Sequence, residues 1–173
     1  MTRESTRAAN PIGIIIRPAT PADLPTIGRL GALLVKTHHE FDPKRFFGVT
    51  GRTEQGYGSF IGTQLEQPNI VVLTAVQDTR VIGYTYAGVE GRDWMSLRGP
   101  AGVLYDIVVD PEQRGHGVGR MLLDATLASL KALGVRQVVL STAERNASAQ
   151  RLFASAGFRT TMIEMTRELD EGT

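Results

Sequence analysis

The stretch Val108–Arg120 constrains the fold of this chain more than any other part of the sequence. An apolar, β-branched run is followed by a turn and then by three alternating glycines, Gly115, Gly117 and Gly119, and a helical pattern begins at once. Alternating glycines leave a loop without side chains, so several backbone N–H groups can point to one place. Free amides and the dipole at a helix N-terminus strengthen that effect. The stretch therefore predicts a strand, a loop that binds phosphate or pyrophosphate, and a helix.

Length and composition indicate a single globular domain. The chain has 173 residues, a net charge of +1 and no cysteine. This charge gives no reason to expect nucleic acid or an acidic membrane surface as a partner. The lack of cysteine excludes a disulfide framework, a thiolate metal site and a cysteine nucleophile, and it fits a cytoplasmic protein. We expect no metal site, because His38 and His39 lack the i, i+4 spacing of helical metal ligands.

Hydrophobic patterns define the expected elements. Residues 1–11 are polar and resemble a flexible tail, so we expect one domain over residues 12–173. Strands are expected over 12–17, 70–76, 81–89, 103–109, 135–142 and 158–166, and helices over about 20–38, 57–66, 121–133 and 147–156. The pattern predicts an α+β fold in which helices interrupt a mostly antiparallel sheet.

Two motifs resemble those of the Gcn5-related N-acetyltransferases (GNAT). Arg114, Gly117 and Gly119 match the family's signature of Arg or Gln, two residues, Gly, one residue, Gly or Ala. The segments Asn146–Phe153 and Ala156–Phe158 resemble its second block, in which an asparagine opens a helix and a Gly-Phe pair precedes a strand. The resemblance implies an α/β/α sandwich, with a central sheet of about six to seven strands flanked by about four helices.

The resemblance also implies acetyl-CoA, or another acyl-CoA, as cofactor. Loop amides would hold the pyrophosphate, the strand before the loop would pair with the pantetheine arm, and an amide near Val108 would stabilise the oxyanion. The residues expected at the cofactor are Ile107, Val108, Val109, Arg114, Gly115, His116, Gly117, Val118, Gly119, Arg120, Asn146 and Phe153. A Rossmann site would need G-x-G-x-x-G, but Arg120 occupies the third glycine position. A plain flexible turn is the alternative without a ligand.

The catalytic groups remain open at this point. Many relatives carry a tyrosine that can protonate the leaving thiolate, whereas this chain has Phe153, which has no acidic hydroxyl. Three alternatives are open. The thiolate leaves without direct protonation, water or another tyrosine acts as the acid in place of this residue, or the chain binds acyl-CoA without efficient turnover. Asp106 and Glu144 are the candidate general bases, and each also has a purely structural alternative. His38, Glu40 and Tyr105 are the candidate substrate contacts.

The sequence thus predicts an acetyl-CoA-dependent N-acetyltransferase that works by direct attack of an amine on the thioester. The expected acceptor is a primary amine of a small molecule, with a protein N-terminus or lysine as second choice. The alternative is a non-catalytic acyl-CoA-binding or sensor module on the same fold. No nucleic acid or membrane partner is expected. The resemblance implies a homodimer that forms through residues 160–166.

Overall fold

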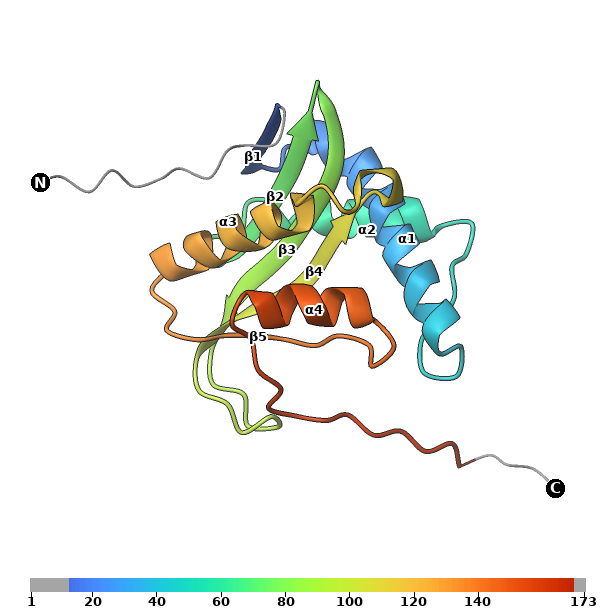
Figure 1. Ribbon diagram of the computed structural model, residues 1–173, viewed down its shortest axis with the longest axis vertical. Coiled ribbons are helices and arrows are strands. Elements are labelled where there is room, and N and C mark those ends of the chain that lie inside the picture. Colours follow the sequence, from blue (N-terminus) through green and yellow to red (C-terminus); the bar gives the residue numbers. More distant parts are fainter. Residues whose placement is uncertain (1–12, 170–173) are drawn as a thin grey trace, which may run out of the picture.

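The order of elements follows the hydrophobic pattern closely. The computed structural model describes residues 13–169 (Figure 1). Its strands and helices are, in chain order, β1 (Ile14–Pro18), α1 (Leu24–Phe41), α2 (Thr53–Gln64), β2 (Ile70–Gln77), β3 (Arg80–Glu90), β4 (Ala101–Val109), α3 (Val118–Ala132), β5 (Val138–Leu140) and α4 (Ala147–Ser155). Short 3-10 turns precede α1 and follow β4. The expected tail, residues 1–11, lies outside the described residues.

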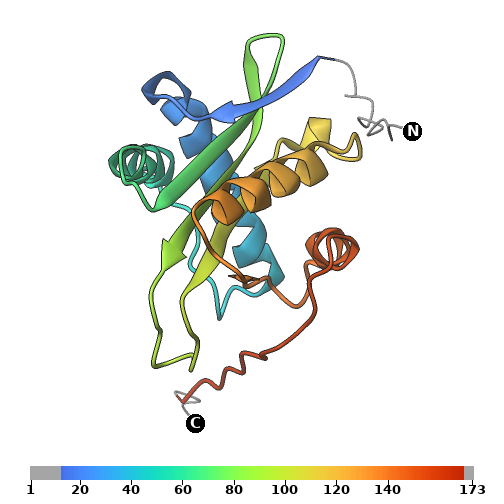
Figure 2. The same cartoon turned by 90° about the vertical axis from the view of Figure 1, so that its left-hand side faces the viewer.

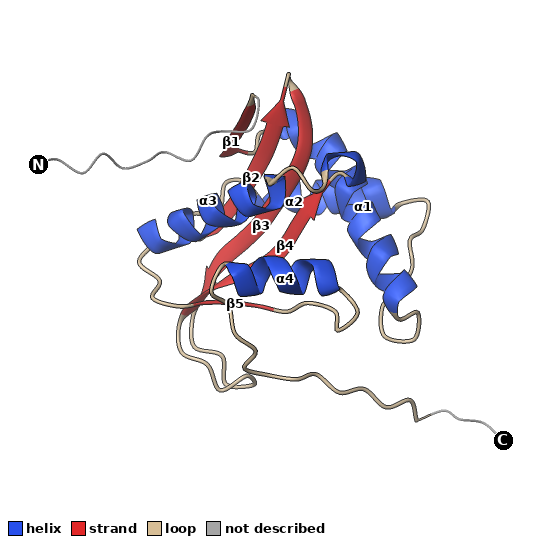
Figure 3. Ribbon diagram, in the orientation of Figure 1, coloured by secondary structure: helices blue, strands red, loops and turns tan. Residues whose placement is uncertain are grey.

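The strands form one sheet in the order β1-β2-β3-β4-β5. The pairs from β1 to β4 are antiparallel, and β5 runs parallel to β4 after a crossover through α3 (Figure 3). The prediction of a mostly antiparallel sheet is confirmed. The expected number of strands is wrong, because the described residues form five strands rather than six to seven.

The missing strand is the one expected over residues 158–166. This segment leaves α4 without joining the sheet and runs across the outside of the molecule (Figure 2). Met162, Ile163 and Met165 are 70%, 80% and 89% exposed. An alternating pattern forms a strand only beside a partner strand, and the nearest sheet edge, β5, has only three residues. The prediction of a strand over residues 158–166 is therefore wrong.

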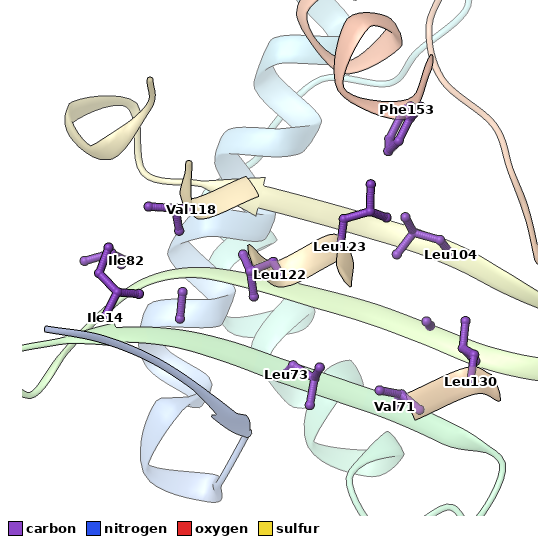
Figure 4. Close-up of a cluster of buried hydrophobic side chains, with 12 residues drawn as sticks. Ile14, Val71, Leu73, Ile82, Leu104, Val118, Leu122, Leu123, Leu130 and Phe153 are labelled. Carbon is purple, nitrogen blue, oxygen red and sulfur yellow. The ribbon is translucent and has the colours of Figure 1, made fainter. Parts of the chain in front are cut away.

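Helices cover both faces of the sheet and produce the expected α/β/α layers (Figure 2). Residues of α3 and α4 pack with the sheet in one core, in which Leu122, Leu123 and Phe153 are buried (Figure 4). Residues of α1 and α2 pack against the other face around Tyr84 and Val108. The two helices on that face approach closely, because a Cβ at Gly31 would lie 2.2 Å from the ring of Tyr57.

Candidate active site

A cavity opens where β4 and β5 diverge. The two strands pair only through Gly102–Leu104 and Val138–Leu140, so the rest of β4 has no partner on that side among the described residues. The cavity has a volume of about 330 Å³. It is lined from α1, the loop after α1, α2, β4, the end of β5 and α4 by Leu34, Val35, His38, Arg45, Phe46, Phe47, Tyr57, Leu104, Tyr105, Asp106, Ile107, Leu140, Ser141, Thr142, Asn146, Ala149 and Phe153.

A β-bulge in β4 sets which side chains face this cavity. The register shifts so that Tyr86 lies opposite Asp106 and Ala87 lies opposite Leu104, which makes Tyr105 the extra residue. A bulge turns two consecutive residues to the same side of a strand. Accordingly, the ring centroids of Tyr105 and Tyr86 lie 4.7 Å apart on the α1–α2 side of the sheet. Asp106 contacts the hydroxyl of Tyr84 on the same side.

Asp106 is the acidic residue of the cavity. Part of its surface opens onto the cavity, but the surrounding protein removes most of the water from its carboxyl group. This desolvation raises the pKa of Asp106 to about 7. The hydroxyl of Tyr84 donates a hydrogen bond to Oδ2 over 3.3 Å, which is too long to offset the desolvation. Asp106 can therefore gain and lose a proton near neutral pH, as a general base must.

The free edge of β4 presents amides to the cavity. The amide of Asp110 donates to the carbonyl of Ile82 in β3. Because amide direction alternates along a strand, the amide of Val108 also points to β3, and those of Ile107 and Val109 point the other way. Val108 is also 5% exposed, within the core under α1 and α2. Of the amides near Val108, the one that points away from β3 and toward the cavity is therefore that of Ile107.

The glycine loop has the conformation that a phosphate cradle needs. Gly115 and Gly117 have φ angles of +80° and +81°, in the left-handed region that favours glycine. A Cβ placed on either of them would meet nothing within 4 Å, so the loop is open above its backbone. Gly117 caps α3, and the amides of Val118 and Gly119 belong to the first turn, which has no intrahelical acceptors. Amides and dipole together form an anion site.

The charged residues of the loop behave differently from one another. Nε of Arg114 donates to the carbonyl of Val109 over 3.2 Å, which holds this guanidinium at the end of β4, and His116 is exposed between the glycines. Arg120 instead binds Asp124 with two hydrogen bonds of 2.8 and 2.9 Å. It also reaches the carbonyl of Ser155 in α4 over 3.3 Å. Arg120 thus joins α3 and α4, and its expected contact with the cofactor stays a prediction.

Asn146 and Phe153 both lie on the α4 wall of the cavity. The side-chain oxygen of Asn146 accepts the amide of Ala149 over 3.2 Å and so caps α4, which leaves its NH₂ group available to a ligand. Phe153 is 6% exposed and packs edge-on against Phe158 at 5.9 Å. Its ring closes the cavity and offers no proton.

The candidate substrate contacts separate into two groups. His38 and Tyr105 line the cavity, and the hydroxyl of Tyr105 donates to Glu90 over 2.6 Å. Glu40 does not line the cavity, because it lies on the exposed side of α1. Its Oε1 is 3.8 Å from Nζ of Lys36.

Glu144 also lies outside the cavity lining. It is exposed on the turn between β5 and α4, because β5 ends at Leu140, before the strand can carry Glu144 into the cleft. Its carbonyl oxygen accepts the side-chain amide of Gln150 over 2.6 Å. Asp106 is therefore the candidate base that the geometry retains.

Sequence reasoning missed Arg45 and Tyr57, which both line the cavity. They lie in the loop after α1 and in α2, more than forty residues before β4, and no local motif marks them. Only the packing of α2 on α1 brings Tyr57 to the site.

Comparison with known proteins gives a consistent result. Residues 35–158 match a family profile that is described as "Acetyltransferase (GNAT) family". A mycothiol acetyltransferase of Thermobispora bispora is 47% identical over 73 residues, which are 42% of this chain and 23% of that protein. The mycothiol acetyltransferase of Nocardia farcinica is 26% identical over 160 residues, covering 90% of this chain and 48% of that protein. The chain thus spans about a quarter to a half of the length of these curated relatives.

Solved structures share the fold. A mutant of the BH1408 protein from Bacillus halodurans has a TM-score of 0.78 at 23% identity, covering 90% of this chain and 99% of that one. The aminoglycoside N-acetyltransferase AAC(6')-Iy in complex with CoA has a TM-score of 0.69 at 19% identity, covering 96% and 99%. Because the family profile spans more than half of the sequence, in agreement with this fold, the chain belongs to the GNAT family of acetyltransferases.

Proposed function

We propose that this protein transfers the acetyl group of acetyl-CoA to the primary amine of a small molecule by direct attack on the thioester. One observation carries the proposal: the unpaired edge of β4 leads from a cavity containing a carboxyl group with a pKa of about 7 to a glycine loop at a helix N-terminus. The group for proton transfer thus lies on β4 itself, and the loop for phosphate binding follows the C-terminal end of the same strand.

The residues present fit acetyl-CoA. The open backbone at Gly115 and Gly117 and the first-turn amides of α3 would bind the pyrophosphate, and Arg114 adds positive charge beside them. The free amide of Val109 would pair with the pantetheine arm, with Asn146 on the opposite wall, which leaves the amide of Ile107 for the thioester oxygen. When bound, acetyl-CoA supplies an activated acyl group, so no covalent enzyme intermediate is needed.

Asp106 would accept the proton that the amine must lose. An amine with a pKa near 10.4 costs on the order of 4–5 kcal/mol to deprotonate at pH 7. A carboxylate with a pKa of about 7 is a far better acceptor for that proton than an ordinary aspartate. The amide of Ile107 would donate to the developing oxyanion. Phe153 supplies no acid, so the thiolate would leave with its negative charge and be protonated by solvent, since thiols ionise near pH 8.5.

The alternative is a non-catalytic acyl-CoA-binding module, and Phe153 is the observation that favours it. The experiment that separates the two is thiol release from acetyl-CoA, measured with a panel of small amines on the wild type and on Asp106→Asn. Amine-dependent release that falls steeply in the variant supports the enzyme. Acetyl-CoA binding without release by any amine supports the module.

A small-molecule acceptor is supported by the names of the relatives, which are mycothiol and aminoglycoside acetyltransferases. The cytoplasm, where acetyl-CoA is available, is the compartment that this cosubstrate implies. No helix among residues 13–169 is long and apolar enough to cross a membrane.

We also infer a homodimer, because Ile163 and Met165 expose apolar surface on an extended segment beside the short edge strand β5. A second copy would cover this surface. Sedimentation of the wild type and of Ile163→Asp tests the inference: the wild type is expected as a dimer and the variant as a monomer. A monomeric wild type contradicts it.

A further inference from the structure

Arg45 gives the cavity a fixed positive charge. It is the only lysine or arginine among the described residues that line the cavity, and Asp106 is the only acidic one. Most of the remaining wall is apolar or aromatic and includes Phe46, Phe47 and Tyr57. A ligand that fills this space therefore meets one guanidinium, one carboxyl group and aromatic surface.

The loop that carries Arg45 is anchored at both of its sides. Oδ1 of Asp42 accepts the amides of Lys44 and Arg45 over 3.1 and 3.2 Å. Nδ1 of His39 donates to the carbonyl of Phe46 over 2.7 Å. The guanidinium of Arg45 also lies over the ring of Phe46, 4.9 Å from its centroid. Arg45 is thus held at the rim of the cavity, with its side chain 40% exposed.

The present partner of Arg45 indicates what this guanidinium binds. Nε of Arg45 donates to the carboxylate of Glu164, which belongs to the exposed segment after α4. The side chain of Glu164 is 66% exposed, and ion pairs in such surroundings exchange easily because water screens them. A ligand carboxylate in the cavity can take the place of Glu164, with the planar fork of arginine suited to both oxygens.

We propose that the acceptor is a small monoamino carboxylic acid with an apolar or aromatic body, whose carboxylate replaces Glu164 on Arg45. This inference rests on the proposed function. The amine nitrogen forms a bond to the acetyl carbon while the C–S bond breaks. The ammonium group first gives one proton to the carboxylate of Asp106, so that the neutral nitrogen can attack. The thiolate leaves with the electron pair of the C–S bond and takes a proton from solvent, while the second proton of the nitrogen is released to solvent. The products are an N-acetylamino acid and CoA.

The same charges disfavour polycationic acceptors. An aminoglycoside or a polyamine carries several ammonium groups, and each would need a carboxylate or exposure to water. The described cavity wall offers only Asp106, and it opposes a second cation with Arg45. Specificity would then arise both from attraction of a carboxylate and from repulsion of an additional ammonium group.

Two matched pairs of acceptors test this inference: phenylalanine against phenethylamine, and 4-(aminomethyl)benzoate against benzylamine. Within at least one pair, the carboxylate form should have a KM lower by about tenfold, the effect of one charge-assisted hydrogen-bonded contact. Arg45→Gln should abolish this advantage. Arg92→Gln is the matched control, because Arg92 is also exposed and stacks on an aromatic ring, Trp94, but lies outside the cavity lining.

Binding provides a second readout that is independent of turnover. In calorimetry with saturating CoA, Glu164→Gln should bind the preferred carboxylate acceptor more tightly than the wild type, since the internal competitor is gone. Arg45→Gln should bind it more weakly.

Two results would overturn the proposal: a carboxylate advantage that persists in Arg45→Gln, or equal or better use of the decarboxylated amine in both pairs. Failure to acetylate any of the four compounds by a protein that binds acetyl-CoA also overturns the acceptor class while leaving the cosubstrate site intact. Failure to bind acetyl-CoA instead contradicts the proposed function itself.

Discussion

The hydroxyl of Tyr84 donates a hydrogen bond to Oδ2 of Asp106 across 3.3 Å, from β3 to the neighbouring strand β4. Tyr84 is fully buried, and burial raises the pKa of its hydroxyl well above 10, so it acts only as a donor at any working pH. The donor steadies a carboxyl group that has lost most of its water. This pair lies next to the β-bulge, where the strand turns Asp106 toward the cavity.

The pH dependence of catalysis follows from Asp106. If its carboxylate accepts the amine proton, kcat/KM rises with pH through an apparent pKa of about 7. Asp106→Asn is expected to lower kcat by about 10²–10⁴-fold, the usual contribution of a general base, and to remove this limb of the profile. Tyr84→Phe should move the limb to higher pH, because it removes a donor to the ionised form. A profile that is flat between pH 6 and 8 in the wild type excludes Asp106 as the base.

Asp106 also makes stability depend on pH. Its folded-state pKa of about 7 lies above the ordinary value of 3.8. The stability associated with the protonated group is complete below pH 4 and is lost as the pH rises through 7. Asp106→Asn should therefore stabilise the fold at pH 8 by roughly 2–4 kcal/mol and leave it nearly unchanged at pH 4. Urea unfolding at both pH values measures this difference, and a variant that is less stable than the wild type at pH 8 is the contrary result.

Asp23 gives the opposite pH dependence. The Arg17 guanidinium, 2.7 Å away, lowers the pKa of Asp23 to about 2, and Thr20 adds hydrogen bonds. Its stabilisation is complete above the unfolded value near 4 and is lost as the pH falls through 2. Asp23→Asn should cost roughly 2–3 kcal/mol at pH 7 and much less at pH 2. Thermal melts at the two pH values check this, and a loss of equal size at both would show that packing, not charge, is responsible.

Phe153→Tyr tests whether the leaving thiolate needs an acid. Phe153 lines the cavity, so a tyrosine hydroxyl at this position would reach into it. Departure without a protein acid predicts a kcat within about threefold of the wild type, since no barrier of even 1 kcal/mol would be removed. If the wild type has no turnover and Phe153→Tyr does, the protein is instead a binding module that lacked only the general acid. Phe153→Leu controls for altered packing against Phe158.

Local patterns predicted the parts of this protein that depend on neighbouring residues. The glycines of the loop and the cap at Asn146 have local causes and lie where the sequence indicated, and α3 begins at Val118, three residues before the predicted start. Residues 158–166 do not form the predicted strand, because strand pairing depends on a sheet edge that is distant in the sequence.

The interior of the site depends on long-range packing, which the sequence does not display. No local signal marks the bulge at Tyr105, and this bulge determines that the amide of Ile107 rather than that of Val108 faces the cavity. Glu144 lies outside the cavity lining because β5 ends at Leu140, before the end of the apolar pattern that was expected to carry Glu144 to the cleft. Arg45 reaches the cavity only through the fold of the loop after α1.

Calorimetric titration with acetyl-CoA tests the central claim most directly, using the variants Gly117→Asp and Gly134→Asp. Both glycines have positive φ angles, +81° and +87°, and open space above them, so aspartate strains the two backbones similarly. Only Gly117→Asp adds a negative charge to the proposed pyrophosphate loop. The account predicts that the wild type and Gly134→Asp bind acetyl-CoA with similar micromolar affinity, whereas Gly117→Asp loses binding while still folded. Equal binding by all three proteins, or none by the wild type, would contradict it.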